Sequence, residues 1–268
     1  MTIKRILVVL EGIDRAMLNG AARLAAALDA ELKGLFVEDV TLFQVAQLPI
    51  SQEINIYTAS TNPLDGRRVT RQIRAQSRRV RRALALAAAP QRIRWTMDIR
   101  RGKVSVEVER AIREADLVIM PRTSDRRGEL TTTARHVLDK MTCPVLLLDE
   151  ELPDRPSVIV VYDGSERAQS AIELSAEGVR QTGGYITVIT VPGPGTSVRT
   201  CQRLAFEFLA SVNLIAQCRW LEQVNPLTVV HTLHEAEADL FVLPVTLMDP
   251  QDMVATVARA ELPTLLVR

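Results

Sequence analysis

Short apolar runs alternate with longer amphipathic stretches along the whole chain. Residues 6–10 and 117–120 are continuous apolar runs, which is typical of strands buried on both faces of a parallel sheet. Between such runs, apolar residues recur at helical spacing, as in residues 17–28, which follow Asp14 as a candidate N-cap. This alternation predicts an α/β protein in which helices cover both faces of a parallel sheet through right-handed crossovers.

The first 150 residues contain one full set of these elements. Residues 93–99 alternate polar and apolar, so this strand is expected to be less central. Residues 40–66 include several prolines and lack sustained periodicity. We expect regular structure to lapse there, in the least ordered long segment of the chain or a lid. Strands are predicted at 6–10, 32–37, 93–99, 117–120 and 145–148, and helices at 17–28, 67–89, 104–115 and 132–141.

The same pattern occurs twice. Residues 114–123 (EADLVIMPRT) return as residues 237–246 (EADLFVLPVT). A period this long exceeds that of any solenoid unit, so each copy is predicted to be a domain with its own core, at residues 1–150 and 151–268. The charged, proline-stiffened segment 149–156 is the predicted linker. Further matches occur in the same order: 6–12 with 158–164, Arg94-Trp95 with Arg219-Trp220, and 144–147 with 263–266.

The second copy repeats the elements in a shorter form. A strand is predicted at 158–162 and a helix at 166–181, with Ser165 as its N-cap. Gly183-Gly184 is a predicted left-handed stop before the strand at 185–191. Residues 192–197 replace the long loop of the first copy, and we expect this tighter turn to leave that side of the second domain more open.

Composition agrees with two compact domains. The chain has 268 residues, of which 47% are hydrophobic, and this supplies two cores. A formal net charge of +1 gives no global field toward nucleic acid or membrane. The chain runs from Met1 directly into a strand, with no room for a signal peptide and no apolar run of spanning length, so we expect a cytoplasmic protein without membrane contact. The scattered cysteines are interpreted as reduced, buried thiols: Cys143, Cys201 and Cys218.

Two strand ends carry recognisable motifs, Leu35-Phe36-Val37-Glu38-Asp39 and Val161-Tyr162-Asp163-Gly164-Ser165. Together with the two Glu-Ala-Asp-Leu strands, they resemble the universal stress protein family in its tandem form. The resemblance covers nearly the whole chain and implies two doubly wound, Rossmann-like parallel sheets of five strands in the order 3-2-1-4-5, packed as a pseudo-dimer about an approximate two-fold axis. Each copy ends in a short apolar strand after a proline that could pair across the repeat, but we expect two separate sheets. The resemblance rests on 35–39, 161–165, the two Glu-Ala-Asp-Leu strands, and the endings 132–148 and 254–267.

The resemblance also implies where a ligand binds. Family members that bind ATP use a carboxylate after strand one and a glycine-rich motif after strand four, at the topological switch point of the sheet. Glycines there let the backbone approach phosphates, and the following helix N-terminus faces the negative charge. Carried onto this sequence, the candidate cofactor-binding residues are Glu11, Gly12, Val37, Arg122, Arg126, Arg127, Thr132 and Asp163.

The chain departs from that motif in both copies. In the first, Pro121 stands at the first glycine position, and only the hydroxyl of Thr132 matches the family's Ser or Thr. The three nearby arginines could bind phosphate as forks, or the loop could simply be solvated and basic. The second copy has no glycine after strand four, and Asp163 serves equally well in a turn before a helix. We therefore expect ATP or another adenine nucleotide, if bound, in the first half only.

Arginines crowd the predicted helix 67–89, with no acidic residue between Asp65 and Asp98. Such a stripe could neutralise the phosphates of nucleic acid or an acidic partner. A solvated or inter-domain salt-bridged helix is the preferred interpretation. His231 and His234 lie three residues apart beside an acidic residue, but no third and fourth ligand is indicated, so no metal site is assigned.

No catalytic arrangement with local context is found in the sequence. We therefore predict a non-catalytic stress-response or regulatory protein, acting on an unidentified protein partner and forming homodimers if it associates with itself. One alternative is an ATP-binding or ATP-hydrolysing universal stress protein, because the fold alone does not exclude catalysis. A weaker alternative is a nucleic-acid-associated protein that uses the helix around Arg67 to Arg82.

Overall fold

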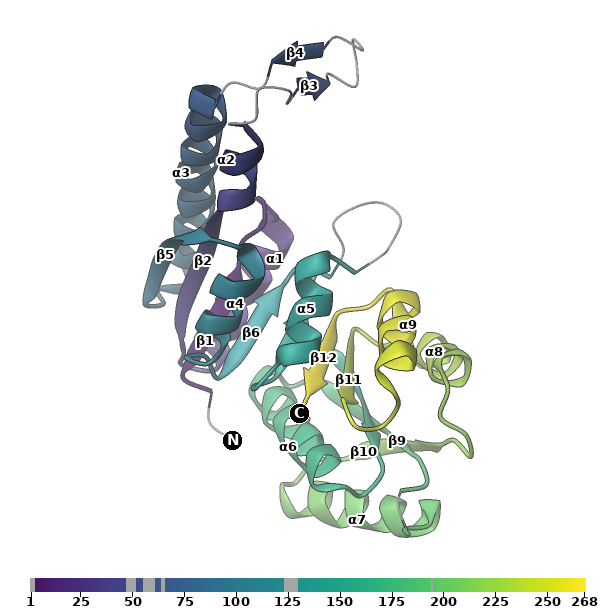
Figure 1. Cartoon of the computed structure of the whole chain (residues 1–268). Helices are drawn as coiled ribbons and strands as arrows, with labels where there is room; N and C mark the ends of the chain where they lie inside the picture. The colour runs from purple at the N-terminus through teal and green to yellow at the C-terminus, as the bar shows by residue number, and fades with distance from the viewer. Residues whose placement is uncertain (1–2, 47–51, 55–60, 64–65, 123–129, 194) are drawn as a thin grey trace.

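The computed structural model describes residues 3–46, 52–54, 61–63, 66–122, 130–193 and 195–268 (Figure 1). In the first half, five strands of the main sheet alternate with helices, and a short antiparallel hairpin lies between α2 and α3. The elements are β1 (Arg5–Val9), α1 (Arg15–Ala27), β2 (Glu31–Asp39), α2 (Val40–Ala46), β3 (Gln52–Ile54), β4 (Thr61–Pro63), α3 (Gly66–Gln91), β5 (Trp95–Gly102), α4 (Val104–Ile112), β6 (Leu117–Met120), α5 (Thr132–Lys140) and β7 (Val145–Leu147).

The second half repeats the series without the hairpin. Its first five elements are β8 (Ser157–Tyr162), α6 (Glu166–Thr182), β9 (Tyr185–Thr190), α7 (Val198–Ser211) and β10 (Ala216–Trp220). The remaining four are α8 (Pro226–Glu235), β11 (Leu240–Pro244), α9 (Pro250–Ala260) and β12 (Thr264–Val267). The predicted alternation of strands and helices is therefore confirmed in both halves.

All main strands belong to one ten-stranded sheet, in the order β10-β9-β8-β11-β12-β7-β6-β1-β2-β5. Each half has the predicted order 3-2-1-4-5, and its strands are parallel to one another. The prediction of two separate sheets is wrong, because β7 and β12 pair antiparallel and join the halves. Consequently the carboxyl ends of the strands lie at opposite edges of the sheet in the two halves.

The register of the β7–β12 pair explains the internal symmetry. Leu146 lies opposite Leu265, and these two residues occupy equivalent positions in the repeat. The flanking pairs, Val145 with Leu266 and Leu147 with Thr264, exchange equivalent positions. A local two-fold axis through the central leucine pair therefore relates the two strands, as the predicted pseudo-dimer requires.

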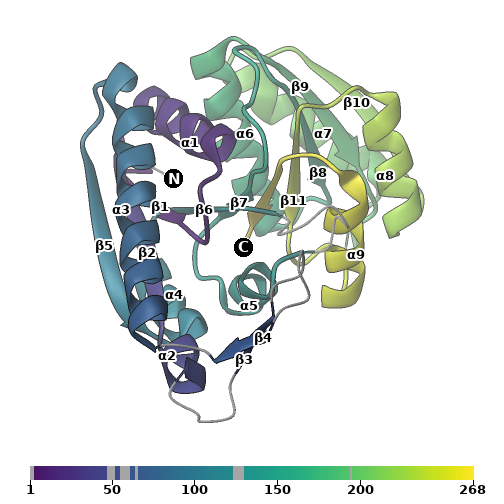
Figure 2. The same cartoon turned by 90° about the horizontal axis from the view of Figure 1, so that it is seen from above.

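Helices cover both faces of the continuous sheet, and each core runs through both halves. One face packs against α1, α3, α6 and α7, with buried side chains that include Met17, Leu84, Ile172 and Leu209. The other face packs against α4, α5, α8 and α9. Figure 2 shows α1 and α6 next to each other across the β7–β12 junction, where both line one small apolar cavity of about 90 Å³.

The ends of several helices have the predicted cap chemistry. Asp14 accepts a hydrogen bond from the Met17 amide at 3.0 Å, and Ser165 caps α6 in the same way at 3.2 Å. Gly183 ends α6 in the left-handed region, with φ of 68°. These local signals predict where α1 and α6 begin and where α6 ends.

The prediction that regular structure lapses in residues 40–66 is wrong for the part that the structure describes. Helix α2 begins directly after β2, because the Asp39 carboxylate accepts a hydrogen bond from the Thr41 amide at 2.8 Å. Phe43 packs against the core, and the Arg101 guanidinium lies 4.2 Å from the centre of its ring. Residues 47–51, 55–60 and 64–65 lie outside the described residues, so the predicted disorder of this segment stays a prediction.

The linker lies along α1. A side chain at Gly20 would approach Leu148 to 2.9 Å, and Asn19 donates a hydrogen bond to Glu151 at 2.6 Å. Arg23 forms ion pairs with Glu151 and Asp154. These contacts hold the start of the second half against the first.

Among the helices that the structure describes, none is long and apolar enough to cross a membrane.

A substitution at the junction tests whether the sheet is one unit. We expect Leu265→Ala in the second half to lower the free energy of unfolding reported by Trp95 in the first half by about 2–4 kcal/mol, because it leaves a cavity in a shared core. A Trp220→Phe background leaves Trp95 as the single tryptophan for denaturant titration.

Leu227→Ala is the matched control, since Leu227 is 71% exposed, and a change below about 0.5 kcal/mol is expected. If Trp95 kept its wild-type transition in Leu265→Ala while the second half unfolded, the two halves would be independent units.

Candidate functional site

A pocket of about 380 Å³ opens at the carboxyl ends of β1 and β2 in the first half, next to the switch point between β1 and β6. Its volume lies in the usual range for small-molecule sites, and ligands of open α/β sheets bind at this place. The walls come from five elements that are distant in sequence. They are the ends of β1 and β2 (9–11, 35–37 and Asp39), α3 (Ile73 and Gln76), the start of α4 (Val104) and the start of α5 (131–133).

The sheet and α3 fix the floor of this pocket. The Leu10 amide donates to the Leu35 carbonyl at 2.9 Å, which continues the β1–β2 ladder past the last strand residue. Gln76 donates from Nε2 to the Glu11 carbonyl at 3.2 Å, so α3 holds the turn after β1 in place. The Glu11 side chain is exposed, and a side chain at the neighbouring Gly12 would meet nothing within 4 Å. The rim above β1 is therefore open.

The start of α5 forms the opposite wall. Thr131 is buried and caps the helix, accepting a hydrogen bond from the Ala134 amide at 2.9 Å. Thr132, the residue that the sequence predicted at the helix start, is the first residue of α5, and its side chain is exposed. Thr131 was not predicted as the cap. Three consecutive threonines at 131–133 each fit that position, so the pattern alone does not single it out.

The polar side chains of the described lining are carboxylates, hydroxyls and one amide, and the rest of the lining is apolar. Glu11 and Asp39 contribute carboxylates, and Asp39 is engaged in capping α2. Arg122 does not line the pocket; its amide and Nε bind the Asp149 carboxylate at 2.8 and 3.2 Å, which joins the ends of β6 and β7. Arg126 and Arg127 lie outside the described residues. The structure thus brings together three predicted residues at this pocket, Glu11, Val37 and Thr132.

The carboxylate at the equivalent place in the second half is buried. Asp163 is 7% exposed, and its carboxylate accepts a hydrogen bond from the Ser165 amide at 2.9 Å, within the turn before α6. Gly193 lies directly against this residue, since a side chain at Gly193 would approach the Asp163 carbonyl to 2.0 Å. The prediction that this shorter turn leaves the second half more open is wrong. A short connection keeps the chain against the strand ends and covers them.

The helix after β11 is also unsuited to phosphate. Asp249 caps α9 and accepts hydrogen bonds from the Gln251 and Asp252 amides, both at 2.9 Å. A carboxylate therefore occupies the helix N-terminus where an anion would bind. In the first half the corresponding cap, Thr131, is neutral.

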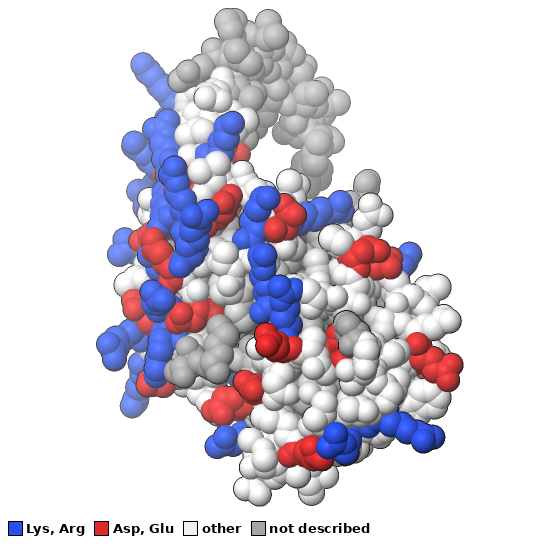
Figure 3. All heavy atoms as spheres, turned by 60° about the horizontal axis from the view of Figure 1, so that its bottom comes forward, with Lys and Arg blue, Asp and Glu red and all other residues white. Residues whose placement is uncertain are grey.

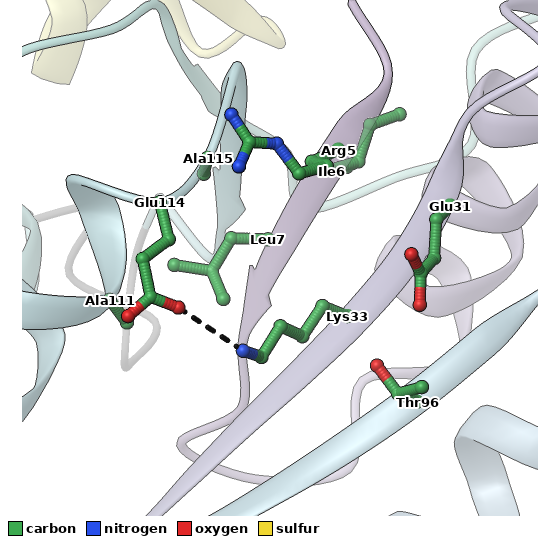
Figure 4. Close-up of a pocket in the computed structure, with 9 residues that line it drawn as sticks. All are labelled: Arg5, Ile6, Leu7, Glu31, Lys33, Thr96, Ala111, Glu114 and Ala115. Atoms are coloured by element: carbon green, nitrogen blue, oxygen red, sulfur yellow. Dashed lines mark hydrogen bonds and ion pairs between the residues drawn. The ribbon is translucent and has the colours of Figure 1, made fainter.

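A second pocket, of about 340 Å³, lies toward the amino-terminal ends of β1 and β2 and is lined by several charged side chains (Figure 4). Lys33 points across it to Glu114 at 3.3 Å and also binds Asp98 at 3.0 Å, while Arg5 binds Asp116 at 3.1 Å. The hydrogen bond between Lys33 and Asp98 raises the pKa of Lys33 and lowers the pKa of Asp98. Because Arg5, Lys33 and Glu114 already have partners, we assign no ligand to this pocket.

The remaining candidate groups contribute no site. Cys143 and Cys201 are buried as predicted, and burial raises the pKa of the Cys143 thiol to about 11. Cys218 is only partly buried, which corrects the prediction. His231 lies 3.3 Å from Glu235 on α8. Within the described residues, no group of three or more His, Cys, Asp or Glu side chains is placed to hold a metal ion.

The closed turn of the second half can be tested at Gly193. Gly193→Ala forces the turn away from the Asp163 carbonyl, and we expect it to destabilise the protein by about 1–3 kcal/mol in thermal or denaturant unfolding. Gly178→Ala in α6 is the control: its added side chain meets nothing within 4 Å, so it should be neutral or stabilise by up to about 1 kcal/mol. Equal effects of the two substitutions would contradict the tight contact.

The charge pairs at the second pocket predict a pH dependence. Asp98→Asn should lower the free energy of unfolding by less than about 1 kcal/mol at pH 7, because the carboxylate is partly exposed and screened. The pKa of Asp98 is lower in the folded state than in the unfolded state. The extra free energy of unfolding of the wild type over Asp98→Asn is therefore present above about pH 4, and it disappears as the pH falls through the folded-state pKa.

Urea titrations at pH 7, 4 and 2.5 measure this difference, and Asp139→Asn, at a mostly exposed carboxylate, is the control. A difference that stayed constant down to pH 2.5 would show that Asp98 stabilises the fold through its shape and not its charge.

Comparison with known proteins agrees with this architecture. No family model and no curated protein sequence matches the chain. Among solved structures, a universal stress protein from Archaeoglobus fulgidus aligns with a TM-score of 0.74 at 16% identity, over 99% of this chain and 98% of its own. A putative universal stress protein from Pseudomonas aeruginosa aligns with a TM-score of 0.58 at 16% identity, over 98% and 92%. A functionally unknown protein from the same species reaches 0.59 at 13% identity, over 98% and 92%. The chain therefore has the fold of the universal stress proteins, repeated in tandem.

Proposed function

We propose that this chain is a non-catalytic regulatory binding protein that takes one adenine nucleotide, weakly, in the pocket of its first half. The observation that supports this most directly is the contrast between the two switch points. One opens into a pocket of about 380 Å³ between Glu11 and the start of α5, whereas the other is covered by the turn around Gly193. The first-half switch point is therefore the one to which we assign the nucleotide.

The lining suits the neutral part of a nucleotide better than its phosphates. The exposed Glu11 carboxylate can accept hydrogen bonds from ribose hydroxyls, and Val37 and Ile73 offer apolar contacts to a base. At the start of α5, the Ala134 amide already donates its hydrogen bond to the Thr131 hydroxyl. The first two amides of the helix and the Thr132 hydroxyl are left to bind phosphate. No arginine is among the described residues that line the pocket, so a guanidinium contact to phosphate could come only from Arg126 and Arg127, which the sequence predicted. Because the described lining offers phosphate no cation, we expect low affinity.

The non-catalytic part of the proposal rests on the same lining. Phosphoryl transfer requires cationic groups that stabilise the developing charge. Among its described residues the pocket has two carboxylates, and its lining contains no lysine, arginine, histidine or cysteine. A cytoplasmic location and action through a protein partner or a homodimer stay predictions from the sequence.

Calorimetric titration of the full-length protein with ATP tests the proposal. We expect one site per chain with a dissociation constant on the order of 0.1 mM, or about −5.5 kcal/mol. Glu11→Ala combined with Thr132→Ala should weaken binding by about 1–2 kcal/mol, since both groups line the pocket. Replacing Arg126 and Arg127 together by alanine should weaken it by a similar amount.

The matched control is Glu222→Ala with Thr246→Ala, which removes the same side-chain types at exposed positions of the second half. This variant should bind ATP like the wild type. Loss of binding in the control alone would place the nucleotide in the second half. Steady phosphate release above background would favour the ATP-hydrolysing alternative.

A further inference from the structure

The outer face of α3 is a dense array of arginines. All eight arginines of this helix are exposed, and the helix contains no lysine and no acidic residue. Six of them form no ion pair or hydrogen bond with any residue that the structure describes. These six, called here the α3 arginine face, are Arg71, Arg74, Arg78, Arg79, Arg81 and Arg82.

Helix geometry places these side chains on one side. At 100° per residue the six lie within an arc of about 160°, opposite the buried stripe that includes Ile73, Val80 and Leu84. From Arg71 to Arg82 the face extends about 16 Å along the axis. The buried stripe packs against the sheet and fixes the helix, so the guanidinium groups project from a rigid, linear support.

The position of α3 leaves this face free of the rest of the protein. Both ribbon views show α3 on the side of the first half that is turned away from the second half (Figures 1 and 2). The six residues of the α3 arginine face therefore form none of the predicted inter-domain salt bridges with the part of the chain that the structure describes, whereas the solvent exposure of the helix is confirmed.

The charge of the whole chain is divided between its halves. Residues 1–150 contain 25 basic and 18 acidic residues, and residues 151–268 contain 8 basic and 14 acidic residues. The net charge of +1 thus combines about +7 on the first half with about −6 on the second. Figure 3 shows Lys and Arg side chains gathered along one side of the molecule. The near-neutral total conceals a strongly basic half.

We propose that the α3 arginine face binds the phosphate backbone of a nucleic acid without reading its sequence. Guanidinium groups bind phosphate oxygens as forks, and an all-arginine array suits this geometry better than a mixed basic patch. The face is linear and as long as several phosphate repeats of a duplex strand. No aromatic side chain lies on α3 to stack on bases, so recognition is through charge alone.

Two other kinds of partner fit the face less well. A membrane-binding helix inserts its apolar side into the bilayer, but the apolar side of α3 is buried in the protein core. At the centre of a protein interface, arginine usually acts together with buried apolar or aromatic anchors. The one large apolar side chain exposed on α3 is Leu86, 63% exposed and beyond the end of the arginine face.

Fluorescence anisotropy of the full-length protein with labelled nucleic acid tests this proposal. One arm uses a 20-base-pair DNA duplex and the other a 20-nucleotide single-stranded RNA, each from 50 to 300 mM KCl. We expect micromolar binding at 50 mM KCl and a slope of log K against log salt of about −3 to −5, in at least one arm. The tighter arm identifies which form of backbone fits the helix.

The test variant replaces three arginines at successive i, i+4 positions: Arg74→Gln, Arg78→Gln and Arg82→Gln. It should weaken binding at least about tenfold and reduce the slope by about 2–3, because each arginine neutralises about one phosphate. The control removes the same charge from exposed positions of the second half with Arg167→Gln, Arg199→Gln and Arg259→Gln, and should weaken binding less than about threefold.

Three results would overturn the proposal. They are no binding in either arm at 50 mM KCl, equal losses in the test and control variants, and tighter binding to phosphatidylserine vesicles than to either nucleic acid at the same salt. Circular dichroism of both variants checks the fold, and ATP titration of the test variant should match the wild type because its three positions do not line the pocket.

Discussion

Three residue pairs between β7 and β12 hold the two halves of the sheet together, and the rest of the architecture depends on them. Without this ladder each half would end in an exposed apolar strand, which is an open template for association with other chains. With it, helices on each face pack over a single core that crosses the junction. Because the ladder is antiparallel, the two switch points lie at opposite edges of the sheet, and neither can complete the other.

The two switch points differ because the chain takes a different route after the second strand of each half. In the second half a short turn returns at once to α7, and Gly193 lies against the Asp163 carbonyl. In the first half the chain leaves the sheet through α2 and returns along α3, so Glu11 stays exposed at the rim. The same fold therefore leaves the end of β1 open and covers the end of β8. Both halves keep a carboxylate at this place, so the difference in exposure comes from the path of the backbone.

Features that depend on neighbouring residues could be predicted from the sequence, such as the strand runs, the caps at Asp14 and Ser165, and the left-handed stop at Gly183. The resemblance to the universal stress protein family also predicted the strand order of each half. The failures concern partners that are distant along the chain. Strand pairing across the junction, the ion pair between Arg122 and Asp149, and the cover over Asp163 depend on three-dimensional approach, which no local pattern records.

The division of charge between the halves gives the molecule a permanent electric dipole along the plane of its sheet. In solution such a particle does not meet a polyanion at random. The field turns it so that the basic half leads and the acidic half trails. The trailing end contains the exposed side chains of Ile215 and Trp220, beside the free edge of β10. A molecule bound to a polyanion through its basic half would therefore expose the β10 edge to solvent, in the same orientation each time.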